Sequence, residues 1–188
     1  MSEISGIAVF RHPHSDEVTL VVQNEGTPAE LLSCAELNGR RGFVIAPFEV
    51  KPEQPILLIR PDRMEQLSLA ALADQSPDIP LNNSIGPTGA TRTHYAIDFA
   101  SEHAQLELGT FQKIVLARCV DEQRESSQKP LDFFLRACEL YPRLFIALVW
   151  TAKSGCWLTA TPEILLKGSG TAWQTVALAG TMKLEGEQ

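Results

Sequence analysis

Four short apolar runs in the C-terminal third of the chain constrain the fold most strongly. Each has the length of a β-strand, and a glycine-containing turn joins the two members of each pair. Two strands joined by so short a turn must run antiparallel, because a parallel connection needs a dozen or more residues. The sequence therefore predicts two hairpins, one of Leu144–Thr151 with Cys156–Ala160 and one of Glu163–Lys167 with Trp173–Leu178.

The N-terminal part predicts four further strands. Gly6–Arg11 and Glu17–Gln23 flank a polar, proline-containing turn. Gly42–Pro47 and Pro55–Arg60 are short apolar runs, and proline limits the first of them.

Three segments have helical character. Pro61–Ala73 begins with proline, which favours the first turn of a helix. Thr93–Leu108 carries apolar residues at roughly helical spacing and is followed by a glycine, a common stop. Pro130–Tyr141 also begins with proline, and another proline follows it.

The order of these elements favours one fold class. Hairpins with interspersed helices indicate an α+β fold, a mostly antiparallel sheet with packed helices, rather than a parallel doubly wound sheet. Residues 74–93 are rich in proline, glycine, asparagine and serine, which predicts a linker. It would separate an N-terminal region, residues 1–73, from residues 94–188.

The charge balance limits the ligands that the chain can attract. It has 16 basic and 23 acidic residues, a net charge of −7, and no basic stripe, so nucleic acid is not an expected partner. An acidic chain also repels anions at long range. An anionic substrate therefore needs a local site of fixed hydrogen-bond donors or a metal ion.

No segment has the features of a membrane span or an export signal. No apolar run approaches the roughly 20 residues that a spanning helix needs, and the N-terminus lacks the basic and apolar regions of a signal peptide. We expect a cytoplasmic protein with no membrane partner. Its cysteines form no C-x-x-C pair and are then expected to be reduced, buried thiols: Cys34, Cys119, Cys138 and Cys156.

Lys113 lies near the start of an apolar run, Phe111–Val120, that is expected to form a central strand. Alternate residues of a strand face opposite sides, and both sides of this run carry apolar side chains. Burial would disfavour the charged ammonium group and lower the lysine pKa, as a general base at neutral pH requires. The alternative, which the local pattern favours, is a strand-end lysine whose side chain reaches water.

Glu163 interrupts two apolar runs and directly follows Pro162. A carboxyl group at such a junction can be partly buried, and its raised pKa would suit a general acid. The alternative, again favoured by the local pattern, is an exposed glutamate in a turn.

Ala179, Gly180 and Thr181 follow the last apolar run. Glycine lets backbone amides approach a ligand closely, and threonine adds a hydroxyl donor. Such donors can hold a carboxylate, and the alternative favoured by the local pattern is an ordinary turn.

Together these three segments resemble the motifs of isochorismate synthases, a family of chorismate-utilising enzymes. The similar segments are the lysine-containing strand, the (A/S)-(T/S)-P-E-x-L motif and the segment after it: Phe111–Arg118 (FQKIVLAR), Ala160–Leu166 (ATPEILL) and Leu178–Thr181 (LAGT). The order agrees, and so does the spacing, with 50 positions from Lys113 to Glu163 and 17 from Glu163 to Gly180. The resemblance is clearest from Tyr95 to Thr181.

The resemblance implies both a fold and a reaction. The chain would be the N-terminal part of one chorismate-binding domain, with residues 94–188 as the start of its catalytic core. In that family the hydroxyl of chorismate moves from ring position 4 to position 2. Lys113 matches the general base that activates the attacking water, and Glu163 matches the general acid that protonates the departing hydroxyl. Ala179, Gly180 and Thr181 match a segment that contacts the substrate carboxylate.

The resemblance also implies a cofactor. The family binds Mg²⁺ through two glutamates, and both are expected beyond residue 188, as are further substrate-binding residues. We therefore expect residues 1–188 to be a fragment that does not turn over chorismate alone. Exposed strand edges of such a partial fold also predict self-association.

The lysine narrows the choice within the family. Anthranilate synthases resemble this layout but usually carry glutamine at this place, whereas isochorismate and salicylate synthases share the lysine. The favoured interpretation is an isomerase that supplies isochorismate for menaquinone or siderophore synthesis. A salicylate synthase, another chorismate-utilising enzyme, and a non-catalytic interaction domain of the same fold remain the alternatives.

Overall fold

Every strand pair that the structure describes is antiparallel, as the hairpin-rich sequence predicts. The structure, a computed structural model, describes residues 4–81, 92–117, 122, 125 and 127–176. The chain divides into two compact units, one formed by Met1–Leu81 with Lys129–Gln188 and the other by Asn82–Gln128. The combination of helices with antiparallel sheets confirms the predicted α+β class.

A five-stranded sheet is the centre of the larger unit, and two predicted hairpins build most of it. Its order is β6-β2-β1-β7-β8. The N-terminal hairpin pairs through β1 with the C-terminal hairpin, with Gly6 opposite Thr151 and Arg11 opposite Ile146. Its strands are β1 (Gly6–Arg11), β2 (Glu17–Gln23), β6 (Arg63–Ser68), β7 (Phe145–Thr151) and β8 (Gly155–Thr161).

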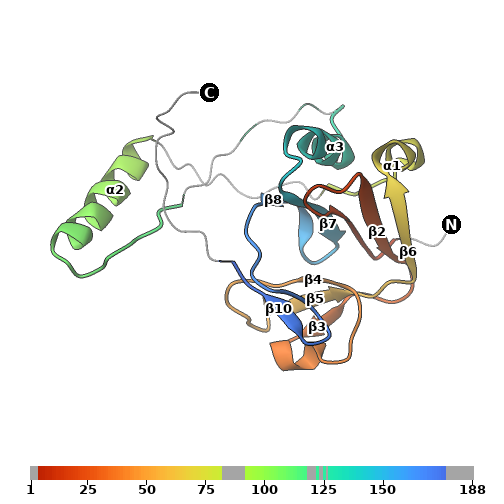
Figure 1. The fold of residues 1–188 in the computed structure, drawn as a ribbon, viewed down its shortest axis with the longest axis horizontal. Helices are drawn as coiled ribbons and strands as arrows, with labels where there is room; N and C mark the ends of the chain where they lie inside the picture. Colours follow the sequence, from red (N-terminus) through yellow and green to blue (C-terminus); the bar gives the residue numbers. More distant parts are fainter. Residues whose placement is uncertain (1–3, 82–91, 118–121, 123–124, 126, 177–188) are drawn as a thin grey trace. The chain divides into compact units, whose positions relative to one another are not determined.

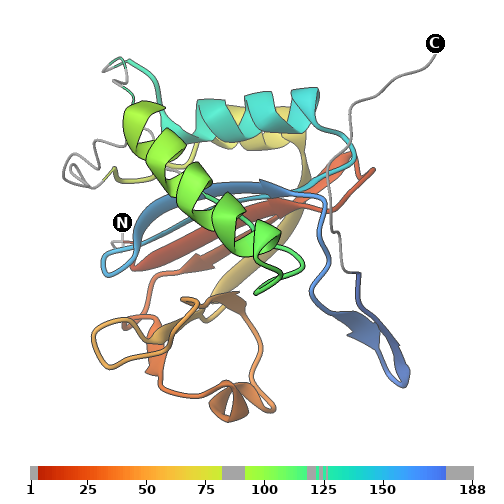
Figure 2. The same ribbon diagram turned by 90° about the vertical axis from the view of Figure 1, so that its left-hand side faces the viewer.

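Both faces of this sheet are covered, which explains why β1, β2 and β7 are mostly apolar on both of their sides. Helices α1 (Leu69–Gln75) and α3 (Pro130–Leu140) lie over one face, and a second sheet lies under the other, as Figures 1 and 2 show. Along β1, Ile7 and Val9 belong to the core on the helix side, and Ala8 belongs to the core on the opposite side. Because successive side chains of a strand point to opposite faces of the sheet, one strand contributes to two separate cores.

The second sheet has three strands in the order β3-β5-β4. They are β3 (Ala29–Leu31), β4 (Phe43–Ile45) and β5 (Ile56–Ile59), and a short 3-10 helix, η1 (Cys34–Leu37), lies between the first two in sequence. Central β5 is fully buried. Ile59 contributes to the core between the two sheets.

Buried Arg11 connects β1 to the end of α3. Its guanidinium donates to the carbonyl oxygens of Cys138 at 2.7 Å and Tyr141 at 2.6 Å, and also to that of Leu144 at 3.2 Å. The last carbonyls of a helix have no partner within the helix, and a cation there also complements the helix dipole. This contact anchors α3 on the sheet.

Part of the Pro61–Ala73 prediction is wrong. Arg63–Ser68 forms strand β6, and only the residues after it form helix α1. β6 pairs with β2 along its whole length, from Val22 opposite Arg63 to Glu17 opposite Ser68. Hydrogen bonding to an existing strand overrides the helical propensity of the segment. Ser68 then caps α1, since its Oγ accepts the N–H of Ala71 at 3.1 Å.

The smaller unit confirms one sequence prediction and contradicts another. Helix α2 spans Arg92–Glu107, and Gly109 follows it with a φ of 71°. None of its described residues is buried. The expected strand Phe111–Val120 is absent from the described residues 111–117, which have no regular structure. A strand needs a neighbour to pair with, and no described strand pairs with this segment.

The last hairpin forms in a shorter version than expected. Its strands are β9 (Lys167–Ser169) and β10 (Ala172–Gln174), joined through Gly170 with a φ of 58°. All six strand residues are exposed. Beyond these short strands, the backbone N–H of Val176 still donates to the carbonyl oxygen of Ile164 at 2.9 Å, so the two arms stay together over part of the expected length.

The region expected as a linker is partly structured. α1 extends to Gln75, and Ile79 is buried in the core on the helix side. Of the cysteines expected as buried thiols, Cys34, Cys138 and Cys156 are free, but Cys34 is exposed; Cys119 lies outside the described residues. No helix in the described part of the chain is long and apolar enough to cross a lipid bilayer.

Candidate functional site

Glu163 lies in the larger unit, two residues after the end of β8. Its backbone N–H donates to Thr161 Oγ1 at 3.1 Å, so the turn after the strand is held locally. The residue is exposed rather than partly buried, which is the setting that the local pattern favours. Its carboxylate is therefore accessible to a ligand.

Lys113 belongs to the smaller unit and is also exposed. The central strand that was expected to bury it is not formed in residues 111–117. The structure describes Lys113 and Glu163 each within its own unit. Ala179, Gly180 and Thr181, the residues predicted to bind the substrate carboxylate, lie outside the described residues.

A sizeable cavity lies elsewhere, at one end of the second sheet. Its volume is about 620 Å³, and neither Lys113 nor Glu163 lines it. Two cavities of about 420 Å³ each lie nearby in the same unit, one along Pro28 and Thr151 and one beside Trp157. The cavity of about 620 Å³ is lined by residues from β2 to the end of β5: Gln23, Glu25, Gly26, Thr27, Ala29, Arg40, Arg41, Leu58 and Arg60.

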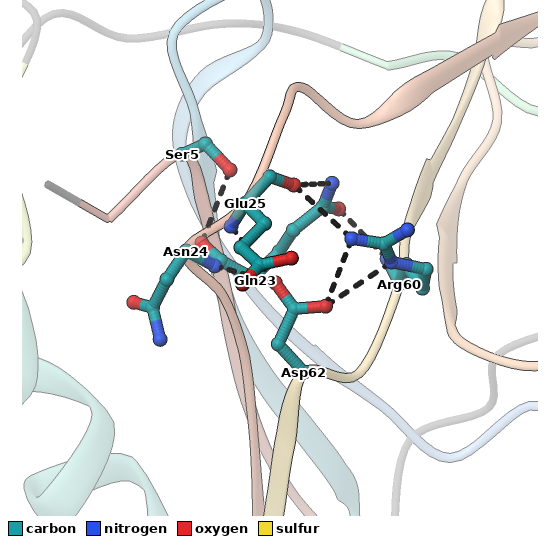
Figure 3. Close-up of polar contacts among 6 residues, drawn as sticks. All are labelled: Ser5, Gln23, Asn24, Glu25, Arg60 and Asp62. Atoms are coloured by element: carbon teal, nitrogen blue, oxygen red, sulfur yellow. Dashed lines mark hydrogen bonds and ion pairs between the residues drawn. The ribbon is translucent and has the colours of Figure 1, made fainter. Parts of the chain in front are cut away.

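Three residues that line this cavity, Gln23, Glu25 and Arg60, belong to one hydrogen-bonded cluster, and Figure 3 shows its contacts. Gln23 is only 3% exposed. Its side chain accepts the N–H of Arg60 at 2.8 Å and donates to the carbonyl oxygen of Glu25 at 3.0 Å. Arg60 in turn donates to the same carbonyl oxygen at 3.3 Å. A single buried amide thus fixes both the loop after β2 and the residue after β5.

Asp62 completes this cluster (Figure 3). Its Oδ2 accepts the backbone N–H groups of Glu25 and Asn24, both at 2.9 Å, and its Oδ1 accepts from Arg60 Nε at 3.1 Å. The backbone donors, and then the Arg60 charge, hold the pKa of the Asp62 carboxyl below its usual range. Asp62 is therefore ionised at neutral pH and orients Arg60.

The sequence analysis did not predict this cavity or the arginines that line it. The signal available was the segment Gly39–Gly42, in which two arginines stand between two glycines. Such a turn presents adjacent cations on a well-defined backbone. It was not recognised because Arg40 and Arg41 come to line one cavity with Arg60 only when β4 and β5 pair.

The described residues contain no metal site. They include no group of three or more histidine, cysteine, aspartate or glutamate side chains placed to hold a metal ion. The resemblance places both Mg²⁺-binding glutamates beyond residue 188, so the expected Mg²⁺ site stays a prediction.

Comparison with known proteins identifies a family. A family model described as chorismate binding enzyme matches residues 39–188. No curated protein and no solved structure matches the chain. The antiparallel sheets with packed helices are consistent with part of the fold of that family.

Proposed function

The chain belongs to the chorismate binding enzyme family, and we propose that it acts in the synthesis of isochorismate from chorismate. The observation that carries this proposal is the extent of the match, residues 39–188, which includes Lys113, Glu163 and the segment from Ala179 to Thr181. Family membership supports chorismate as the ligand. The lysine supports attack by water rather than by ammonia, through the resemblance to isochorismate synthases.

In the proposed reaction, two side chains move two protons. Neutral Lys113 accepts a proton from water, and the oxygen of that water forms a bond to ring carbon 2. Electrons shift through the ring, and the bond from carbon 4 to its hydroxyl breaks. Glu163 donates its proton to that hydroxyl, which leaves as water. The reaction therefore needs the lysine deprotonated and the glutamate protonated before each turnover.

The remaining residues in this proposal bind the substrate. Gly180 and Thr181 offer a backbone N–H and a hydroxyl to a carboxylate of chorismate. Mg²⁺ would offset the negative charge of a second carboxylate, and we propose that residues after Gln188 hold it. On this proposal residues 1–188 alone do not convert chorismate. Steady formation of isochorismate by this chain with Mg²⁺ would contradict it.

Substitution of Lys113 tests the assignment of the base. In the full-length gene product with Mg²⁺, Lys113→Ala is expected to lower kcat by about 10²- to 10⁴-fold, the range for loss of a general base. Lys129→Ala removes a lysine next to α3 and should leave kcat unchanged. Equal activities of the two variants would exclude Lys113 as the base.

Glu163→Gln tests the acid in the same way, because the amide keeps the shape of the side chain but has no proton to give. Its control is Glu49→Gln, which removes an exposed carboxylate paired with Lys51. We expect a loss of kcat similar in size to that for the lysine variant, with little change in KM. A change in KM alone would assign Glu163 to substrate binding.

Product analysis separates isochorismate synthesis from the alternative of salicylate synthesis. Salicylate formation releases pyruvate, whereas isomerisation does not. We expect isochorismate without pyruvate when chorismate is supplied. A stoichiometric yield of pyruvate would identify a lyase step and contradict the proposal.

We also propose that this chain self-associates through a sheet edge. Among the described strands, β8 ends the five-stranded sheet and carries no charged residue. Charged side chains usually protect such edges from pairing with another chain. Light scattering of residues 1–188 should then give a mass above that of the monomer, and a monomer at all concentrations would refute this.

A further inference from the structure

Three chain segments meet at one end of the second sheet. Thr27 precedes β3, Arg41 precedes β4, and Arg60 follows β5. Central β5 runs antiparallel to both of its neighbours. The end of β5 therefore lies beside the starts of β3 and β4, and the cavity of about 620 Å³ opens there. This volume is within the usual range for sites that bind small molecules.

The charged residues that line this cavity are mostly cationic. They are Glu25, Arg40, Arg41 and Arg60, in a chain whose net charge is −7. Arg60 pairs with Asp62 at 3.0 Å, but among the described residues Arg40 takes part in no ion pair. Arg41 donates only to Met64 Sδ, at 3.5 Å, among the described residues. In the part of the chain that the structure describes, two guanidinium groups beside the cavity thus have no anionic partner.

The backbone around these cations is held in place. The Gln23 and Asp62 hydrogen bonds fix Arg60 and the loop after β2 (Figure 3). On the other side, Gly42 lies so close to β5 that an added Cβ would stand 2.2 Å from the Ile59 carbonyl oxygen. The backbone at the start of β4, next to Arg41, therefore packs directly against the end of β5. A site held in this way loses little conformational entropy when a ligand binds.

The cavity also has an apolar side. Leu58 and Ala29 line it together with the arginines. Guanidinium groups match the planar geometry of a carboxylate and can bind it through two parallel hydrogen bonds. We propose that this cavity binds a small organic carboxylate with an apolar body, with Arg40 and Arg41 on the carboxylate. The inference rests on the second sheet alone and does not depend on the proposed function.

A carboxylate fits better than inorganic phosphate for two reasons. Phosphate has no apolar part to place against Leu58. It also carries more charge at neutral pH, and the acidic chain repels a more highly charged anion more strongly at long range. The proposal therefore predicts a preference between two anions as well as binding of one.

Three probes test this preference at constant ionic strength: benzoate, benzamide and inorganic phosphate. Benzoate has both the charge and the apolar body, benzamide has the body alone, and phosphate has the charge alone. In amide NMR titrations of the 188-residue chain, benzoate should shift the signals of Gly26, Thr27 and Arg41, and the other probes should not. Equal shifts with phosphate, or with benzamide, would overturn the proposal.

Variants then test which residues bind. The double variant Arg40→Gln with Arg41→Gln is expected to raise the Kd for benzoate by about tenfold or more, since hydrogen bonds to a charged group are among the stronger ones. Arg136→Gln is the control, because it removes an exposed arginine that pairs with Glu139 on α3. Similar losses in both would show only a long-range effect of charge and contradict the site. Unchanged far-UV circular dichroism would verify that the variants fold.

Discussion

Two seven-residue runs that were both expected to lie in strands adopt different structures. Phe145–Thr151 forms β7 and is buried along almost its whole length. Phe111–Ala117 has no regular structure, and its Val115 side chain is 78% exposed. β7 has a partner strand on each edge and a covered surface on each face. Among the described strands none pairs with the second run. The comparison indicates that an apolar run forms a strand here where it has neighbours to pair with and pack against.

Truncation of one side chain in each run gives the largest expected contrast. Leu148 is 1% exposed in β7, and Leu148→Ala should lower the free energy of unfolding by about 2–5 kcal/mol through lost burial and a cavity. Val115→Ala should change it by less than about 0.5 kcal/mol. Urea denaturation followed by circular dichroism measures both. Equal losses would break the comparison and place Val115 in a core.

The same contrast should appear in thiol chemistry. Burial raises the pKa of the Cys138 thiol to about 11, more than the nearby Arg11 charge lowers it, whereas Cys34 is exposed. Only the thiolate reacts with disulfide reagents. In a Cys119→Ser background at pH 8, we expect Cys34 to react at least about a hundredfold faster than Cys138.

Mass spectrometry of the labelled peptides would assign the rates to each cysteine. Urea should abolish the difference, because unfolding exposes both thiols. Fast labelling of Cys138 in the folded protein would show that α3 does not stay packed on the sheet.

Gly42 extends the comparison to the second sheet, where a neighbour is close enough to restrict the residue type. An added Cβ at Gly42 would stand 2.2 Å from the Ile59 oxygen, whereas one at Gly39 would meet nothing within 4 Å. Both glycines have a positive φ. Gly42→Ala is expected to cost about 2 kcal/mol or more, and Gly39→Ala only about 1 kcal/mol. Equal costs in urea denaturation would show that contact with β5 contributes nothing.

The smallest expected effect concerns Asp62, which binds the loop after β2 rather than a strand. Its folded pKa is lowered, first by the Glu25 N–H and then by the Asn24 N–H. A lowered folded pKa contributes stability above the unfolded pKa, about 4 for aspartate, and that contribution is lost as the pH falls through the folded pKa. Asp62→Asn should therefore be slightly less stable than the parent at pH 7, and the difference should shrink in acid.

Denaturation at a series of pH values checks this, with Asp16→Asn in the β1–β2 turn as the control. A stability difference that is constant from neutral to acidic pH would show that the Asp62 charge is not involved. It would leave only the shape of the side chain as the cause.

Local patterns were enough to predict the hairpins and two of the helices. β1 and β2 begin and end at the predicted residues, and α3 begins at the predicted proline. These elements depend on turn residues and on the alternation of apolar and polar residues, and both can be recognised in residues close together in the sequence. β6 was missed because its partner, β2, lies some forty positions earlier in the chain. The cavity with Arg40 and Arg41 was missed for the same reason.

The candidate catalytic residues were predicted on another basis than the strands and helices. Lys113 and Glu163 were chosen from segments that resemble a family, and the family match to residues 39–188 includes both. The roles of these residues remain predictions. Their exposure agrees with the simpler local interpretation of each pattern. Burial of Lys113 in a strand was the part of the prediction that the described residues contradict.

By itself the sequence determined the antiparallel α+β class, the positions of the turns and the motifs that identify the family. These follow from contacts between residues close in the chain or from residue order alone. Tertiary structure alone decided which apolar runs became buried strands and which cations gathered around one cavity. Both outcomes require contacts between segments far apart in the chain. The interaction energy of such contacts is gained only when both segments are in place.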